Sequence, residues 1–143
     1  AHVDLALPTF EDERALFGDE TPEACLARLR AHGVEMAAIK LGADGCLLYD
    51  RHGSRRIAAP PVAPVIDTTA AGDAFNAGFL AGLIHGEHAE RAALRGHRVA
   101  GIVIRHRGAI VPRAEMMASL AAAVDDATAS AAGAERRDPQ RMA

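Results

Sequence analysis

The amino-acid sequence predicts an α/β fold with a mostly parallel sheet. Residues 34–40 form a nearly continuous apolar run, which is typical of a strand that is covered on both faces. Helical patterns lie on either side of this run, at residues 22–32 and 70–84, so strands and helices alternate along the chain. In such sheets, ligands bind where strands end and helices begin, and we expect the functional site at those junctions.

The elements before residue 40 have clear start and stop signals. Residues 3–7 are predicted as a short apolar strand, and residues 10–17 as a short helix that Gly18 ends. Thr21 and Pro22 favour the start of the next helix, because Thr caps free N–H groups and Pro fits the first turn. The chain opens directly in a strand, which indicates a piece of a longer protein.

A hairpin and two further helices follow. Residues 46–49 and 55–58 flank a turn and are predicted as paired strands. In the helix predicted at 70–84, one face is aromatic and apolar, and small residues keep the helix thin enough to lie close to a sheet. A last helix is predicted at 87–104. We expect residues 1–120 to form one domain and residues 121–143, rich in Ala, Asp and Ser, to form a disordered tail.

Composition excludes several classes of function. The 143 residues are 50% hydrophobic but only 3% aromatic, and the net charge is −3 with the basic residues spread along the chain. A nucleic-acid partner would need a concentrated basic face, and a membrane span would need about 18 consecutive apolar residues. Neither is present, and no signal peptide opens the chain. Cys25 and Cys46 are far apart, which predicts reduced thiols in a cytoplasmic protein.

The segment from Asp67 to Phe75, Asp-Thr-Thr-Ala-Ala-Gly-Asp-Ala-Phe, carries the predicted chemistry. Ala70, Ala71 and Gly72 have little or no side chain, so a ligand can approach their backbone. Their N–H groups fall in the first turn of a helix, where free donors and the helix dipole attract anions. Asp73 beside this anion hole is placed to take a proton from an attacking hydroxyl.

Two simpler interpretations stay open for the acids taken singly. Asp67 could be a helix N-cap, and Asp73 a partner of the helix dipole. The combination of two acids, two threonines and three small residues favours a catalytic turn instead.

This segment resembles the second signature of the phosphofructokinase-B/ribokinase family of carbohydrate kinases, and the resemblance extends over about residues 3–117. It implies a ribokinase-like three-layer αβα sandwich, of which this chain would be the C-terminal part. It implies that Asp73 is the general base and that Ala70, Ala71, Gly72 and the Asp73 backbone form the anion hole. Asp67 and Thr69 would lie near a monovalent-cation site, and residues 105–109 would supply carbonyl groups to it.

Other segments fit the same family. Lys40 to Gly45 resembles its strand-then-glycine turn, which makes Lys40, Gly42 and Gly45 candidate contacts of ATP, although a simple β-turn is the alternative. His97 falls on the helix that lines the adenine pocket, where Asn is common, or is an ordinary buried histidine. Thr9-x-x-Asp12 stands where the family has Asn-x-x-Glu, a motif linked to Mg²⁺, and a plain helix cap is the alternative.

Within the family, the chain looks most like the 2-keto-3-deoxygluconate kinases. The resemblance implies ATP, Mg²⁺ and K⁺ as cofactors, a sugar or sugar acid as substrate, and a homodimer for the full-length protein. Sugar contacts in this family come mostly from the N-terminal half, so we expect this chain alone to bind ATP weakly and not to turn over sugar. The alternative function is an inactive nucleotide-binding or regulatory fragment of a truncated kinase.

Overall fold

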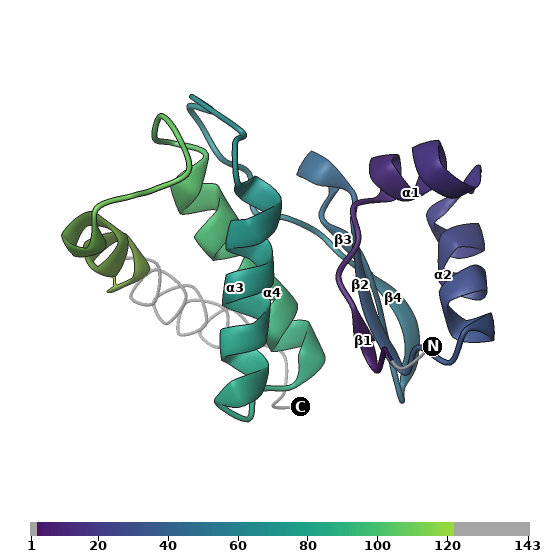
Figure 1. The fold of residues 1–143 in the computed structure, drawn as a ribbon. Coiled ribbons are helices and arrows are strands. Elements are labelled where there is room, and N and C mark those ends of the chain that lie inside the picture. The colour runs from purple at the N-terminus through teal and green to yellow at the C-terminus, as the bar shows by residue number, and fades with distance from the viewer. Residues whose placement is uncertain (1–2, 122–143) are drawn as a thin grey trace, which may run out of the picture. The chain divides into compact units, whose positions relative to one another are not determined.

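The computed structural model describes residues 3–121. The chain divides into two units, Ala1–Ala109 and Ile110–Ala143. The first unit holds the sheet and helices α1 to α4 (Figure 1). In the second unit, residues 113–121 are helical. The tail predicted for residues 121–143 lies, apart from its first residue, outside the described residues.

The sheet of the first unit has four strands in the order β1–β2–β3–β4. Their bounds are β1 Leu5–Ala6, β2 Met36–Lys40, β3 Cys46–Asp50 and β4 Gly53–Ile57. β1 runs parallel to β2, whereas the other two pairs are antiparallel. The α/β class is confirmed, but the sheet is mixed rather than mostly parallel. The reason is local, because β2, β3 and β4 follow one another through short turns, and short turns join only antiparallel strands.

Helices cover both faces of the sheet (Figure 1). Their bounds are α1 Phe10–Phe17, α2 Pro22–Ala31, α3 Ala71–Ile84 and α4 Ala89–Val103. Cys25 and Leu26 of α2 pack against Ala37, Ile39 and Leu47 of the sheet in one buried cluster. A second cluster joins the opposite sheet face to α3 and α4, through Ala38, Cys46, Leu48, Ile57, Phe75, Phe79, Ala89, Ala92 and Ala93. The three-layer arrangement follows from the alternation of side chains along each strand.

The predicted aromatic face of α3 packs toward the sheet. Phe75 is 2% and Phe79 0% exposed, and their rings stack with centroids 5.9 Å apart. Two of the small residues of α3, Gly78 and Gly82, face α4. A Cβ on Gly78 would lie 2.9 Å from the Cα of Gly96, and one on Gly82 would lie 2.9 Å from the Cα of Ala92. The glycines therefore let the two helix backbones approach closely.

Several predicted element ends are confirmed. The Thr21 hydroxyl accepts a hydrogen bond of 3.1 Å from the Ala24 N–H, with Pro22 in the first turn of α2. Gly18 ends α1 in the left-handed conformation. β1 pairs with β2 alone, so its other edge carries no partner strand within residues 3–121. Cys25 and Cys46 are both free and buried. Among the described helices, none has the length and apolar character needed to cross a membrane.

Candidate active site

The turn that precedes α3 holds an unusual backbone conformation. Ala70 is the N-cap residue and lies in the left-handed region at φ 60° and ψ 14°. This conformation is strained for a residue with a Cβ, and the smallest such side chain minimises the strain. The N–H of Ala71 donates to the carbonyl oxygen of Thr68 at 3.1 Å, which closes the turn. The chain thus bends sharply into α3.

The bend leaves backbone donors free. The first N–H groups of a helix have no acceptor within it, and Ala70 has no side-chain oxygen that could cap them. Within the described part of the chain, the N–H groups of Ala70, Gly72 and Asp73 donate to no backbone acceptor. Three of the four backbone donors of the predicted anion hole are therefore free to bind a ligand. The fourth, the Ala71 N–H, is used by the hydrogen bond that closes the turn.

Asp67 fastens this turn to a distant loop. One carboxylate oxygen accepts the N–H of Thr69 at 2.9 Å, and the other accepts the N–H of Gly108 at 2.9 Å. Hydrogen bonds from the Thr69 side chain and backbone, and then from Gly108, lower the pKa of Asp67 to about 2. Asp67 is thus not the N-cap of α3. Its carboxylate joins the turn before α3 to the 105–109 loop that the resemblance links to a cation.

A second backbone feature lies after β2. Gly42–Asp44 forms a single 3₁₀ turn, and Gly42 and Gly45 both have positive φ, at 62° and 98°. A Cβ on Gly45 would lie 2.0 Å from the carbonyl oxygen of Ile57, so only glycine fits there. Lys40, the last residue of β2, lies next to the turn that starts α3. A Cβ on Gly72 would be 3.5 Å from Lys40 Nζ.

A cavity of about 450 Å³ joins these features. The predicted site residues that line it come from β2, the turn after it, and helices α3 and α4: Lys40, Gly42, Gly45, Ala71, Gly72 and His97. Apolar and proline residues form much of the remaining wall, including Ala59, Pro60, Pro61, Val62, Ala100 and Ile104. Asp73 is exposed in the first turn of α3, next to Gly72. Asp67 and Thr69 lie earlier in the same turn and do not line the cavity.

His97 is buried in the wall of this cavity, with 8% of its surface exposed. Its ring lies 4.8 Å from that of Phe75, measured between centroids. The Nε2 atom is buried and has no hydrogen-bond partner. Burial lowers the pKa of His97, and a hydrogen bond to the Ile57 backbone opposes this only in part. A neutral imidazole with one unused nitrogen therefore lines a mostly apolar cavity.

This burial predicts that acid destabilises the fold. The folded state keeps His97 neutral below the pH at which an unfolded histidine, with a pKa of about 6.5, takes up a proton. The unfolded state binds more protons in that window, so the free energy of unfolding falls as pH decreases from 6.5 toward the lowered pKa, by at most about 1.4 kcal/mol per pH unit. Urea unfolding at pH 7, 6 and 5 measures the slope. His97→Gln should flatten it, and an equal slope in this variant would contradict the prediction.

Comparison with known proteins identifies the family to which the chain belongs. The model of the "pfkB family carbohydrate kinase" matches residues 1–116. The chain belongs to this family. It is 46% identical over 120 residues to the 2-dehydro-3-deoxygluconokinase of Escherichia coli K12, a match that covers 81% of this chain and 38% of that protein. The chain thus spans less than two-fifths of that relative's length.

Solved structures agree with this assignment. The ribokinase of Thermotoga maritima is 31% identical, with a TM-score of 0.68, over 82% of this chain and 42% of that one. The aminoimidazole riboside kinase of Salmonella enterica, solved with aminoimidazole riboside and an ATP analog, is 27% identical with a TM-score of 0.71, over the same shares. The predicted ribokinase-like α/β fold is confirmed by these neighbours.

Thr9 and Asp12 are the residues that the resemblance matches to the family's Asn-x-x-Glu motif. Thr9 is the N-cap residue of α1, but its side chain makes no capping hydrogen bond. Instead it lines the cavity and forms an isolated parallel β-bridge with Lys40. Thr9 therefore lies at the N-cap position that the helix-cap interpretation predicts, but its side chain does not make the capping hydrogen bond.

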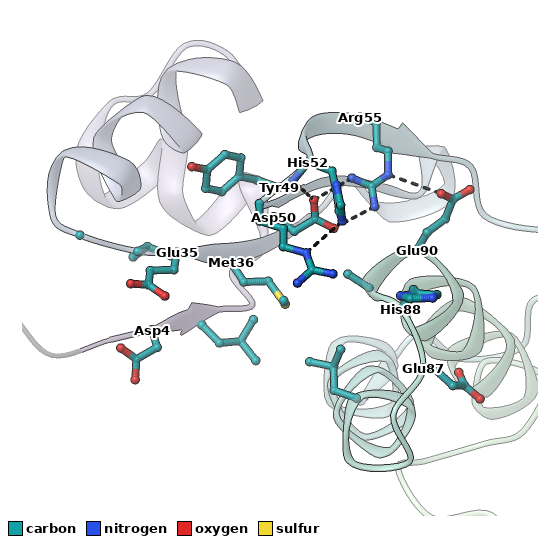
Figure 2. Close-up of a pocket in the computed structure, with 16 residues that line it drawn as sticks. Asp4, Glu35, Met36, Tyr49, Asp50, His52, Arg55, Glu87, His88 and Glu90 are labelled. Carbon is teal, nitrogen blue, oxygen red and sulfur yellow. Dashed lines mark hydrogen bonds and ion pairs between the residues drawn. The ribbon is translucent and has the colours of Figure 1, made fainter.

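A larger hollow of about 1310 Å³ lies elsewhere in this carbohydrate kinase domain (Figure 2). Asp50, which is 6% exposed, accepts hydrogen bonds from Arg55, and Arg55 also pairs with Glu90 of α4 at 3.5 Å. Besides Asp50, four carboxylates line the hollow, those of Asp4, Glu35, Glu87 and Glu90, together with the basic side chains of Arg51 and Arg55. None of the predicted site residues lines this larger hollow. The wall is of mixed charge, because Arg55 pairs with Asp50 and Glu90 and Arg95 pairs with Glu87. The smaller cavity, which the predicted site residues line, is the candidate active site.

One contact in the candidate site was not predicted from the sequence. Asn76 of α3 accepts a hydrogen bond of 3.0 Å from Lys40 Nζ. Its position four residues after Gly72 places it on the same face of α3. That spacing is the only local signal, and it becomes informative once Lys40 is known to lie against this face.

Proposed function

We propose that this domain binds ATP in the 450 Å³ cavity and transfers its terminal phosphoryl group to a sugar hydroxyl. The observation that carries the proposal is the turn before α3, where the N–H groups of Ala70, Gly72 and Asp73 are free and Gly72 lies beside the Lys40 ammonium. A mostly apolar cavity that ends in such donors suits a nucleotide, because the base is apolar and the phosphates are anionic.

The reaction assigns a separate role to each part of the turn. The sugar hydroxyl gives its proton to the Asp73 carboxylate as its oxygen attacks the terminal phosphorus. A new P–O bond forms, the bond to the leaving ADP oxygen breaks, and negative charge spreads over the transferred group. The free N–H groups of Ala70, Gly72 and Asp73 and the N-terminal dipole of α3 stabilise this charge.

Mg²⁺ fits this site only together with the nucleotide. Lys40, which lines the cavity, experiences the charges of two carboxylates, Asp73 and Asp12. Magnesium in kinases is held by one or two carboxylates plus phosphate oxygens, so Asp12 is the side chain that would hold it in this chain. The ion supplies charge neutralisation of the phosphates when bound.

A monovalent cation such as K⁺ is proposed at the junction of the two loops that Asp67 joins. The support is the pair of hydrogen bonds from Thr69 and Gly108 to the Asp67 carboxylate, which hold these loops together. These bonds lower the pKa of the Asp67 carboxyl to about 2, so the carboxylate keeps its charge even under mildly acidic conditions. A cation there would stabilise the turn through the loop carbonyl groups.

The proposed substrate is 2-keto-3-deoxygluconate, and the product is its 6-phosphate. The support is the 46% identity to the Escherichia coli protein named 2-dehydro-3-deoxygluconokinase, the same sugar acid under another name. The chain spans 38% of that relative, so substrate choice depends on parts of a whole enzyme that this chain does not supply.

A chimera tests the proposal. Residues 3–117 of this chain replace the matching segment of the Escherichia coli relative, and ATP-dependent phosphorylation of 2-keto-3-deoxygluconate is measured by ADP release. We expect the chimera to phosphorylate 2-keto-3-deoxygluconate faster than a control reaction without enzyme. Ribose and fructose 6-phosphate serve as control substrates. A folded chimera that binds ATP but phosphorylates none of the three sugars would contradict the proposed activity.

A further inference from the structure

Lys40 is the only lysine in the chain, and the other 15 of its 16 basic Lys and Arg residues are arginines. It lies at the carboxyl end of β2, is half-buried and lines the 450 Å³ cavity. An ammonium is a compact point charge with three donors, whereas a guanidinium is a planar fork. The ammonium of Lys40, the single lysine of the chain, is therefore suited to bind a small, rounded anionic group in the cavity.

The surroundings of the ammonium are polar but do not neutralise it. Lys40 Nζ donates one hydrogen bond, to the Asn76 amide oxygen at 3.0 Å. Lys40 forms no ion pair with a carboxylate in residues 3–121. Its charged neighbours are Asp73 of α3 and Asp12 of α1, which oppose the lowering of the Lys40 pKa by burial. Two of the three N–H donors thus remain for a ligand.

Asn76 and Gly72 fix where the ammonium lies. They are four residues apart on α3 and share one face of the helix. With no side chain on Gly72, the space beside the free N–H groups stays open, and Nζ lies 3.5 Å from where a Cβ would be. A neutral amide at position 76 holds the ammonium next to this space without cancelling its charge, which a carboxylate there would do.

We propose that Lys40 contacts the phosphoryl group that is transferred at the Ala70–Gly72 turn, and that Asn76 is the positioning residue that holds its ammonium there. The inference rests on the proposed function and extends it, because it names the side chain that complements the backbone donors. Lys40 supplies the positive charge that binds the phosphoryl group. Asn76 does not touch the phosphoryl group and contributes only by holding the Lys40 ammonium in place.

The experiment uses the single lysine of the chain. Lysine labelled with ¹³C and ¹⁵N gives one side-chain NMR signal, that of Lys40. ATP and inorganic tripolyphosphate are titrated separately, so that a phosphate contact is distinguished from a contact with the base. We expect both ligands to shift the signal.

Lys40→Met should weaken ATP binding by about 10- to 100-fold, the range of a charge-assisted hydrogen bond. Arg14→Met, which removes an exposed positive charge elsewhere, should leave binding unchanged.

Variants of Asn76 test positioning. Asn76→Asp should raise the Lys40 pKa read from its NMR titration and weaken ATP binding, since the new carboxylate neutralises the ammonium. Asn76→Leu should weaken binding less and broaden or move the Lys40 signal, and Asn76→Gln should restore part of the affinity. Thermal unfolding checks that each variant is folded. Unchanged ATP binding in both Asn76→Asp and Asn76→Leu would overturn the positioning role.

The remaining outcomes separate this inference from the proposed function. If the chain binds ATP while the Lys40 signal stays unmoved and Lys40→Met binds equally well, Lys40 does not contact phosphate and only the inference fails. If ATP moves the signal but tripolyphosphate does not, the contact is not with phosphate and the inference is again overturned. If the wild-type chain binds neither ligand, the proposed function itself is contradicted, and the inference with it.

Discussion

Gly45→Ala is expected to cost roughly 4 kcal/mol of the free energy of unfolding, the upper range for a single substitution with a named steric cause. A methyl group there would lie 2.0 Å from the Ile57 carbonyl oxygen and 2.7 Å from the Ala59 backbone nitrogen. Both neighbours are backbone atoms at the end of β4, which cannot turn aside as a flexible side chain could. The φ of 98° adds strain for any residue with a Cβ.

Gly42→Ala is the matched control for that prediction. Gly42 also has a positive φ, at 62°, but a Cβ there would meet no atom within 4 Å. Its cost is therefore the conformational strain alone, about 1 kcal/mol. Urea unfolding of both variants separates the steric contribution from the conformational one. Equal losses in the two would show that the approach of the Ile57 backbone to Gly45 does not limit this turn.

Asp73→Asn is expected to lower kcat in the chimera by about 10²- to 10⁴-fold, the usual contribution of a general base. The amide keeps the size of the carboxylate but cannot accept the hydroxyl proton. Asp73 is exposed at the first turn of α3, so the substitution removes no buried contact. The backbone donors of the turn stay in place, and ATP binding should therefore change little.

Steady-state kinetics and ATP titration of the same variant check this separation. Glu20→Gln, which changes an exposed acid of the loop before α2, should leave both kcat and ATP binding unaffected. A loss of ATP binding equal to the loss in kcat would assign Asp73 to the ligand site rather than to proton transfer. Turnover within tenfold of the unmodified chimera would show that Asp73 is not the base.

The Thr21 and Gly18 predictions succeeded because each depends on neighbours within four residues. The Thr21 hydroxyl caps the helix that follows it, and Gly18 ends the helix before it. The turn before α3 belongs to the same class, because its small residues and its acid lie within one helical turn. The antiparallel pair of β3 and β4 is the hairpin that the sequence predicted. The main difference from the predicted sheet is the pairing of β2 with β3, because the short turn after Lys40 imposes an antiparallel arrangement that the pattern did not reveal.

By itself, the sequence determined the order of the elements, the small-residue turn at 70–72 and the acid beside it, since these follow from local propensity and spacing. Only the tertiary structure decided which distant groups meet. Lys40 reaches Asn76 across 36 residues, Asp67 reaches Gly108 across 41, and Gly78 approaches α4 rather than the sheet. The physical reason is that such contacts depend on how buried faces pack, and many partners satisfy the same local pattern.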